Sequence, residues 1–213
     1  MKRTDWLIGA VAGAVLAAGG ITAAVAATDD SSGSGSGSGV DGAPSATSAD
    51  AGFARDMSVH HQQAVEMSYV VRDRTKNEEI RRLAYDIAQT QANQRGMMLG
   101  WLDLWELPKV SEDAPMKWMG MGDAPAGDDG ALMPGMATNA QMKRLGELNG
   151  RKAEIYYLRL MTAHHKGGIH MAQGCVERCA VPVERRLAQG MVESQESEVK
   201  LMADLLKARG ARP

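Results

Sequence analysis

The 213-residue sequence predicts an all-α fold, a four-helix bundle made of two repeated helical hairpins. An internal match, a helical spacing of apolar residues and the lack of sustained strand alternation indicate this class. The match aligns Met57–Met67 with Met161–Met171, an offset of 104 residues (161 − 57). The offset holds without a gap over residues 55–102, so we expect two copies of one unit.

Each copy is predicted to fold as two helices. The apolar residues of Phe53–Met67 recur at steps of three and four, which places them on one face of an α-helix. The first copy should break near Asp73–Asn77, because Asn is typical of a helix cap. The second should break near Cys179–Pro182, because Pro suits a first helical turn. One amphipathic hairpin cannot cover its own apolar face, so the two should pack together with approximate two-fold symmetry.

The N-terminal segment is typical of export. Lys2 and Arg3 precede an apolar run, Trp6–Ala27, that carries no charge. Basic residues before such a run orient the N-terminus to the cytoplasm, and the run is long enough to span a bilayer. We predict either an uncleaved membrane anchor or a signal peptide cleaved near Ala24–Ala27. In both cases the bundle lies outside the cytoplasm, anchored to the cell membrane or secreted.

The chain therefore divides into five predicted parts. These are a signal peptide or membrane anchor (1–28), a flexible Gly/Ser linker (29–49), a first helical hairpin (50–108), a Met-rich connecting loop (109–137) and a second hairpin (138–213). Within the last part, Thr138–Gln141 resembles a capping box that opens a short helix.

All five histidines lie inside the two matched stretches, which makes a metal site the first functional hypothesis. Histidine is the commonest metal-binding side chain and Met is a soft ligand. Met57 lies one helical turn before His61, and Met161 one turn before His165, as a shared ion would need. The alternative is that these side chains only pack in a helical core. The predicted metal ligands are His60, His61, His164, His165, Met57, Met161, Met67, Met171, Gln91, Met98, Gln195, Glu198 and Met202.

Six further residues are possible additional ligands. His170 matches Glu66 in the first copy, so it is either an extra ligand or an exposed residue. Five methionines lie in the connecting loop, where packing does not require so many, and they could capture Cu(I). They are Met116, Met119, Met121, Met133 and Met136.

The only two cysteines, Cys175 and Cys179, lie where the first helix of the second copy should end. Outside the cytoplasm such a pair can form a disulfide. Free thiols or soft-metal ligands are the alternative. The matched residues of the first copy are Val71 and Thr75, so the histidine site does not depend on the pair.

The predicted donors favour copper, as Cu(I) or Cu(II), with another transition metal possible. Zinc usually takes Cys, His and carboxylate ligands. Iron sites in four-helix bundles use inward carboxylates with Glu-x-x-His pairs, and this chain has no such pair. We predict no catalytic residue, so metal binding is favoured over catalysis.

The pattern Met-x-x-His-His-x-x-Ala-x-x-Met, followed by Leu-Ala and then Gln-x-x-Glu-x-x-x-Met, resembles the bacterial domain of unknown function 305 family over about residues 50–209. The resemblance implies a ferritin-like fold of four helices and export. For some members it also implies copper binding and copper tolerance. One departure is Gln94, which stands where the motif and the second copy (Glu198) have Glu, so the two halves should differ in affinity.

We therefore expect an exported, membrane-tethered protein that binds copper and sequesters or passes it at the cell surface. A ferritin-like metal-dependent oxidoreductase and a non-catalytic helical interaction module are the alternatives. A net charge of −2 without a basic stripe gives no sign of nucleic-acid binding. The expected partners are the metal ion and, through the N-terminal segment, the membrane.

Overall fold

The computed structural model describes residues 42–121 and 129–212 of the chain. Neither of these ranges contains a strand, so the all-α prediction is confirmed. The helices are α1 (Ala49–Arg74), α2 (Glu78–Leu104), η1 (Lys117–Met119), α3 (Asn139–Glu147), α4 (Gly150–Arg178) and α5 (Pro182–Ala208).

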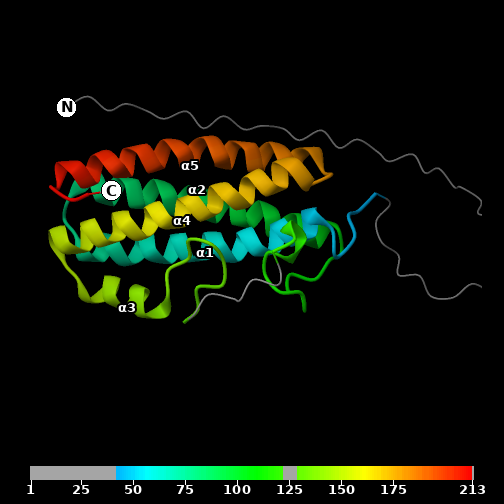
Figure 1. The fold of residues 1–213 in the computed structure, drawn as a ribbon, viewed down its shortest axis with the longest axis horizontal. Helices are drawn as coiled ribbons and strands as arrows, with labels where there is room; N and C mark the ends of the chain where they lie inside the picture. The colour runs from blue at the N-terminus through cyan, green and yellow to red at the C-terminus, as the bar shows by residue number, and fades with distance from the viewer. Residues whose placement is uncertain (1–41, 122–128, 213) are drawn as a thin grey trace, which may run out of the picture. The chain divides into compact units, whose positions relative to one another are not determined.

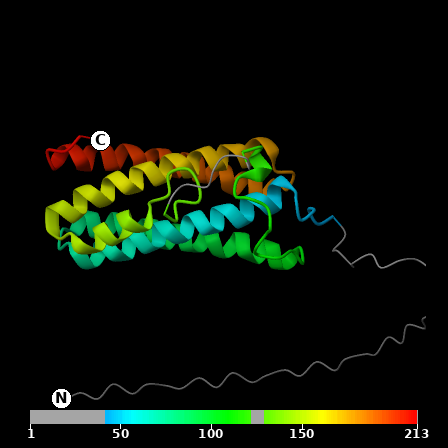
Figure 2. The same cartoon turned by 60° about the horizontal axis from the view of Figure 1, so that its bottom comes forward.

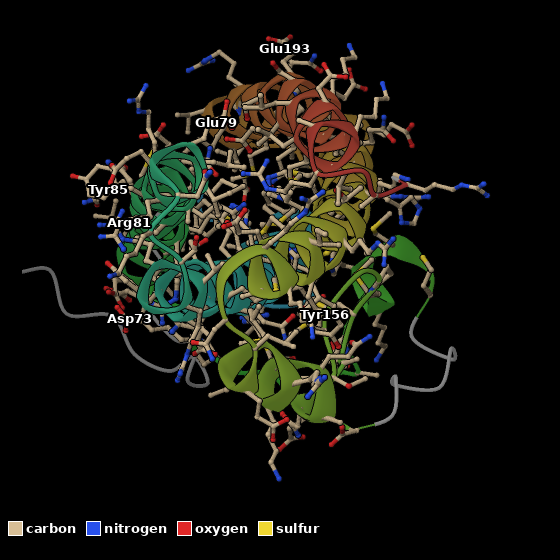
Figure 3. The ribbon with its side chains drawn as sticks, turned by 90° about the vertical axis from the view of Figure 1, so that its left-hand side faces the viewer. Asp73, Glu79, Arg81, Tyr85, Tyr156 and Glu193 are labelled. Carbon is tan, nitrogen blue, oxygen red and sulfur yellow. A yellow bond between two sulfur atoms is a disulfide. The ribbon has the colours of Figure 1, made fainter. Side chains whose placement is uncertain are left out.

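The four long helices lie side by side along most of their length (Figures 1 and 2). α1 packs on α2 and α4 packs on α5, as two antiparallel hairpins, and α1 also packs on α4. In the end-on view, side chains fill the space between these helices, whereas Tyr85 and Glu193 project outward (Figure 3). The arrangement agrees with the four-helix bundle that the sequence predicts.

The predicted breaks between helices occur where expected. Asn77 accepts a hydrogen bond from the backbone N of Ile80 at 3.1 Å and so opens α2. Pro182 occupies the first turn of α5. Thr138 and Gln141 make both hydrogen bonds of a capping box at the start of α3.

The bundle begins with a capped helix. The hydroxyl of Ser48 accepts a hydrogen bond from Ala51 N at 3.1 Å, and α1 starts at Ala49. The predicted signal peptide or anchor (1–28) lies outside the described residues. Across 42–121 and 129–212, no helix is both long and apolar enough to cross a membrane.

The apolar core consists of two clusters at opposite ends of the bundle. One draws on residues 51–57 of α1 and 171–175 of α4, and the other on residues 64–71 of α1 and 157–161 of α4. The paired histidines, at 60–61 and 164–165, fall between these segments on both helices. The fold therefore places them in the middle of the bundle.

A buried polar network joins the two hairpins at the end where α5 finishes. Arg209 Nε donates to Glu154 at 2.7 Å, and Thr75 Oγ1 donates to the other oxygen of Glu154 at 2.6 Å. Arg209 also donates to Asn77 Oδ1 at 3.1 Å. The turn between α1 and α2 is thereby tied to the last turn of α5.

The connecting loop is fixed to the α1 and α4 surface. Asp56 accepts hydrogen bonds from Met116 N at 2.7 Å and from Trp118 Nε1 at 2.9 Å. Further along, the side chain of Gln63 accepts from Ala137 N at 2.6 Å and donates to Ala137 O at 2.8 Å. α3 also contacts both α1 and α4, and the loop and α3 lie on the same side of the bundle (Figure 1).

Candidate metal centre

The two histidine pairs meet in the centre of the bundle. The rings of His60 and His164 lie 3.8 Å apart between centroids, at an interplanar angle of 32°. His164 Nε2 lies 2.9 Å from the backbone oxygen of His60. The His164 and His165 rings are 6.4 Å apart. All four histidines, His60, His61, His164 and His165, have no exposed surface, and we call them the histidine cluster.

Every Nε2 atom of the histidine cluster faces an oxygen. The partners are Pro134 O for His60 (3.1 Å), Gln94 Oε1 for His61 (2.9 Å), His60 O for His164 (2.9 Å) and Glu198 Oε2 for His165 (2.6 Å). Carbonyl and carboxylate oxygens only accept, so each Nε2 carries the hydrogen. The lone pair of each neutral ring then sits on Nδ1.

The four Nδ1 atoms are buried, and none has a hydrogen-bond partner within the described part of the chain. Buried polar atoms nearly always have a hydrogen-bond partner, so four unpaired nitrogen atoms in one core require an explanation. A metal ion is one, because an imidazole whose other nitrogen donates to an oxygen is the usual form of a metal-binding histidine.

Burial keeps the rings of His60, His61 and His164 neutral. Loss of hydration lowers the pKa of His60 to about 4 and that of His61 to about 3. Burial, and then the neighbouring His60, also lower the pKa of His164 well below its ordinary value. Metal ligands must be deprotonated, so these three histidines can bind a metal at neutral pH without releasing protons.

Two predicted amide ligands share this core. Both polar side-chain atoms of Gln91, and the oxygen of Gln195, are buried without a hydrogen-bond partner among the described residues. Gln195 lies against Gly168, where its oxygen is only 2.6 Å from the point that a Cβ would occupy. Any side chain at 168 would therefore displace Gln195.

The six methionines predicted as ligands are all fully buried but do not form a single group. The cluster that contains Phe53 also holds Met57, Met98 and Met171. The cluster that contains Leu145 holds Met67, Met161 and Met202. Each group takes two methionines from one hairpin and one from the other. The core therefore offers thioethers on both sides of the histidine segments.

The possible extra ligands are distributed differently. His170 is exposed on α4, outside the core. Met116 and Met133 are buried, and Met119, Met121 and Met136 are half-buried against the same apolar cluster as Met57. The connecting-loop methionines thus pack on one end of the bundle, and packing accounts for them without a metal.

Cys175 and Cys179 are joined by a disulfide at the end of α4. Both are buried in the apolar cluster that contains Met171. They are not partners of the histidine cluster in any hydrogen bond of the structure's described ranges.

Two partners of the histidine cluster were absent from the predicted ligand set, namely Gln94 and Pro134. Gln94 had a signal in the sequence: it follows His61 by 33 residues, as Glu198 follows His165. Pro134 had none, since its carbonyl reaches His60 only because the connecting loop crosses α4 at Gly167, where a Cβ would overlap Pro134 O.

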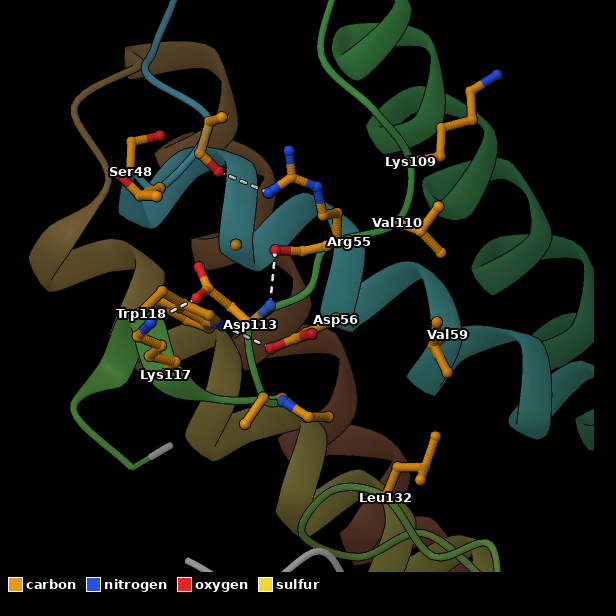
Figure 4. Close-up of a pocket in the computed structure, with 16 residues that line it drawn as sticks. Ser48, Arg55, Asp56, Val59, Lys109, Val110, Asp113, Lys117, Trp118 and Leu132 are labelled. Carbon is orange, nitrogen blue, oxygen red and sulfur yellow. Dashed lines mark hydrogen bonds and ion pairs between the residues drawn. The ribbon is translucent and has the colours of Figure 1, made fainter. Parts of the chain in front are cut away.

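A pocket of about 520 Å³ lies elsewhere, between the start of α1 and the connecting loop (Figure 4). Arg55, Asp56, Lys109 and Trp118 line it, with both signs of charge. No predicted metal ligand does. It is therefore separate from the histidine cluster.

The fold and the cluster define a class of protein: helical bundles with a buried histidine cluster in the middle of the core. The chain belongs to the family described as domain of unknown function (DUF305), whose model matches residues 50–206. The resemblance seen in the sequence is thereby confirmed. A comparison with curated proteins gives no match.

Solved structures of the family share the fold. A candidate secreted DUF305 protein from Streptomyces coelicolor is 74% identical, with a TM-score of 0.74, and covers 79% of this chain and 98% of its own. A DUF305 fragment from Deinococcus radiodurans is 28% identical, with a TM-score of 0.62, 75% of this chain covered and 96% of the fragment.

CopM is a more distant neighbour, solved in Cu(I)-bound and Cu(II)-bound forms. These forms are 20% and 24% identical to this chain, each with a TM-score of 0.57. Each covers 75% of this chain and 96% of CopM. At such identities the likeness shows the fold alone.

Proposed function

We propose that this protein binds copper outside the cytoplasm and sequesters it or passes it on at the cell surface. The observation that carries the proposal is the set of four buried Nδ1 atoms without a hydrogen-bond partner among the described residues, each on a ring whose Nε2 is fixed by an oxygen. A helical fold shared with copper-bound CopM, and the candidate secreted relative, support it.

The proposed ligands combine imidazole and thioether. His61 and His165 each have a core methionine one turn away on their own helix, Met57 and Met161. Nitrogen donors suit both Cu(I) and Cu(II), whereas thioethers favour Cu(I). The buried amides of Gln91 and Gln195 supply further oxygen donors without adding charge. Copper is here the cargo of the protein, and the site requires no chemistry beyond binding.

The fold also bears on a ferritin-like oxidoreductase. Bundle sites that activate oxygen through iron use several inward carboxylates. Around the histidine cluster, the hydrogen bonds of the described residues include one carboxylate, Glu198, and its side chain is 24% exposed. A binding role therefore fits this donor set better than an oxidative one.

Copper titration tests the proposal. The full-length chain is titrated with Cu(I) and Cu(II) against a chromophoric chelator, alongside the double variant His61→Ala/His165→Ala. His170→Ala, an exposed histidine on the same helix, is the control. We expect the double variant to lose tight binding and the control to keep it, with circular dichroism confirming both folds. Equal affinity of the double variant and the wild type would overturn the proposal.

The cell-surface location is tested separately. We propose that residues 1–28 export the bundle and either tether it or are removed. Fractionation of cells into membrane and medium, with N-terminal sequencing of the recovered protein, distinguishes the two. Recovery of the protein from the cytoplasm with residues 1–28 intact would contradict both.

A further inference from the structure

A second group of possible ligands lies where α4 ends and α5 begins. Cys175, Cys179 and Glu184 are all buried, and their sulfur and oxygen atoms lie within 4.8 Å of one another. We call these three residues the sulfur–carboxylate cluster. It involves no residue of the histidine cluster.

The corresponding place in the first hairpin is an ordinary core contact. The residues 104 positions earlier are Val71, Thr75 and Ile80. Val71 and Ile80 are fully buried in the apolar core. The second hairpin therefore puts two sulfurs and a carboxyl group where the first has two buried aliphatic side chains and the hydroxyl of Thr75. Packing alone explains the sulfurs, but it does not explain Glu184.

Glu184 has no cationic partner in the described ranges. Its side chain is fully buried, and neither of its carboxyl oxygens accepts a hydrogen bond. Burial, and then the charge of the Asp50 carboxylate and a hydrogen bond to it, raise the pKa of Glu184 to about 9, so the protonated carboxyl group of Glu184 donates to Asp50. Two buried acids that share one proton still carry a charge that no cation balances.

Asp50 adds a second buried carboxylate beside this group. Its exposed fraction is 2%, and its Oδ1 accepts a hydrogen bond from Val181 N at 2.7 Å. Asp50 is thus held against the turn between α4 and α5. Four potential donor groups converge on one end of the bundle.

At the opposite end of the bundle, where α5 finishes, the corresponding buried acid has a cationic partner. The residue 104 positions after Asp50 is Glu154, which touches the other turn through Thr75. Glu154 pairs with Arg209 at 2.7 Å. The residue 104 positions before Arg209 is Trp105, so no arginine stands there. Among the described residues, no salt bridge involves Asp50 or Glu184. The end that holds Asp50 and Glu184 therefore has two buried acids and no paired cation among the described residues. The other end has Glu154 paired with Arg209.

We propose that reduction of the Cys175–Cys179 disulfide turns the sulfur–carboxylate cluster into a binding site for a divalent cation of the zinc class. The two thiolates and Glu184 are the ligands, and Asp50 is the nearest further carboxylate. Thiolate and carboxylate together are the donors that zinc takes in proteins. The disulfide form has no thiolate to offer, so the site is open only in the reduced protein.

The redox step balances with a dithiol as reductant. The Sγ–Sγ bond of Cys175 and Cys179 breaks, and the two sulfurs of the dithiol form a new disulfide. Two electrons and two protons pass from the dithiol to the cysteines. The cation then displaces both thiol protons and the proton on Glu184. Oxidation of the cysteines would release the cation.

The proposal is tested by zinc stoichiometry of the full-length chain. Protein in the disulfide form and protein reduced with a phosphine are each titrated with Zn²⁺, and Co²⁺ serves as a spectroscopic probe. We expect reduced protein to bind one more equivalent of Zn²⁺ and to show thiolate-to-Co²⁺ charge transfer. The difference between the two forms cancels any zinc held by the histidine cluster.

Two variants identify the ligands. Cys175→Val/Cys179→Thr places the first hairpin's own residues at these positions, so the fold should survive, and it should lose the extra equivalent. Glu184→Gln keeps both thiols but should weaken Zn²⁺ binding by at least about tenfold, since even residues that only support a ligand have effects of that size.

Two results would overturn the proposal. One is equal Zn²⁺ stoichiometry in the disulfide and reduced forms. The other is an extra equivalent that Glu184→Gln binds as tightly as the wild type does, because the two thiols would then bind the cation without the carboxylate. Both zinc measurements are independent of copper binding at the histidine cluster, because copper binding is measured on protein in the disulfide form.

Discussion

His164 donates its Nε2 hydrogen to the backbone carbonyl of His60, the residue 104 positions earlier, at 2.9 Å. The acceptor belongs to α1 and the donor to α4, so this bond joins the two hairpins in the middle of the core. A carbonyl in the middle of a helix is already used by the helix, and this second bond uses its remaining lone pair. The donor ring is thereby fixed with Nδ1 unprotonated.

The same bond joins the two histidine pairs into one cluster. His60 and His164 lie ring against ring, and burial, followed by other members of the cluster, lowers the pKa of each. A change in one hairpin therefore reaches histidines of the other. The two halves nevertheless differ in one partner, since His61 faces Gln94 and His165 faces Glu198.

We predict that Glu198→Gln weakens copper binding by about 10- to 100-fold, because a carboxylate that accepts the Nε2 hydrogen makes the imidazole a stronger ligand. Gln94→Glu should strengthen binding for the same reason. Glu196→Gln removes an exposed charge from the same helix and should change little. Competition with a copper chelator measures all three. Equal effects of Glu198→Gln and Glu196→Gln on copper affinity would mean that the affinity depends only on the net charge of the protein.

We predict that the metal-free protein loses stability as the pH falls below about 6.5. In the unfolded chain His60 and His61 bind protons near that pH, but in the folded chain they stay neutral down to about pH 4 and about pH 3. The unfolded state binds more protons in this window, so the free energy of unfolding falls there, by about 1.4 kcal/mol per histidine and pH unit.

Urea unfolding at pH 7.0 and at lower pH checks this window. His61→Gln should reduce the dependence on pH, because it removes one of the two buried rings whose pKa is lowered. Bound copper should oppose the loss, since it competes with protons for the same nitrogens. A stability that is constant down to pH 4 would show that the histidines are solvated in the folded protein.

Much of the fold could be predicted because it depends on local chemistry. The capping box at Thr138 and the first-turn Pro182 act through neighbouring residues, and the structure has both. The helical spacing of apolar residues likewise fixes which faces are buried. Such features require no knowledge of distant contacts.

The environment of the histidines could be predicted only in part. Their burial follows from position on the apolar face, but Pro134 reaches His60 across 74 residues through a loop without regular structure. The division of the methionines also depends on how α1 crosses α4: Met67 belongs to the same core cluster as Met161, not to that of Met57. Sequence spacing gives neighbours within a helix and not across helices.

We predict that Glu154→Ala costs about 3–5 kcal/mol of unfolding free energy, because Arg209 would remain buried without its close carboxylate partner and with only the exposed Glu79 at 3.9 Å. Asp204→Ala breaks a pair with Lys207 whose side chains are 74% and 66% exposed, and it should cost less than about 1 kcal/mol. Chemical denaturation of both variants gives the comparison. Similar losses in the two variants would mean that Arg209 finds water or another acceptor.

Gly167→Ala should loosen the connecting loop and weaken copper binding together. A Cβ at 167 would overlap the carbonyl of Pro134, which is the acceptor for His60, and neither backbone can yield without moving the loop from α4. We expect a loss of about 1–3 kcal/mol, as in other overpacked cores. Gly190→Ala is the matched control, because nothing lies near its Cβ position on α5 and alanine favours helix by about 1 kcal/mol. Thermal unfolding and copper titration of both variants test the link. Loss of stability at Gly167→Ala with unchanged copper affinity would show that the His60–Pro134 bond does not position the ring for binding.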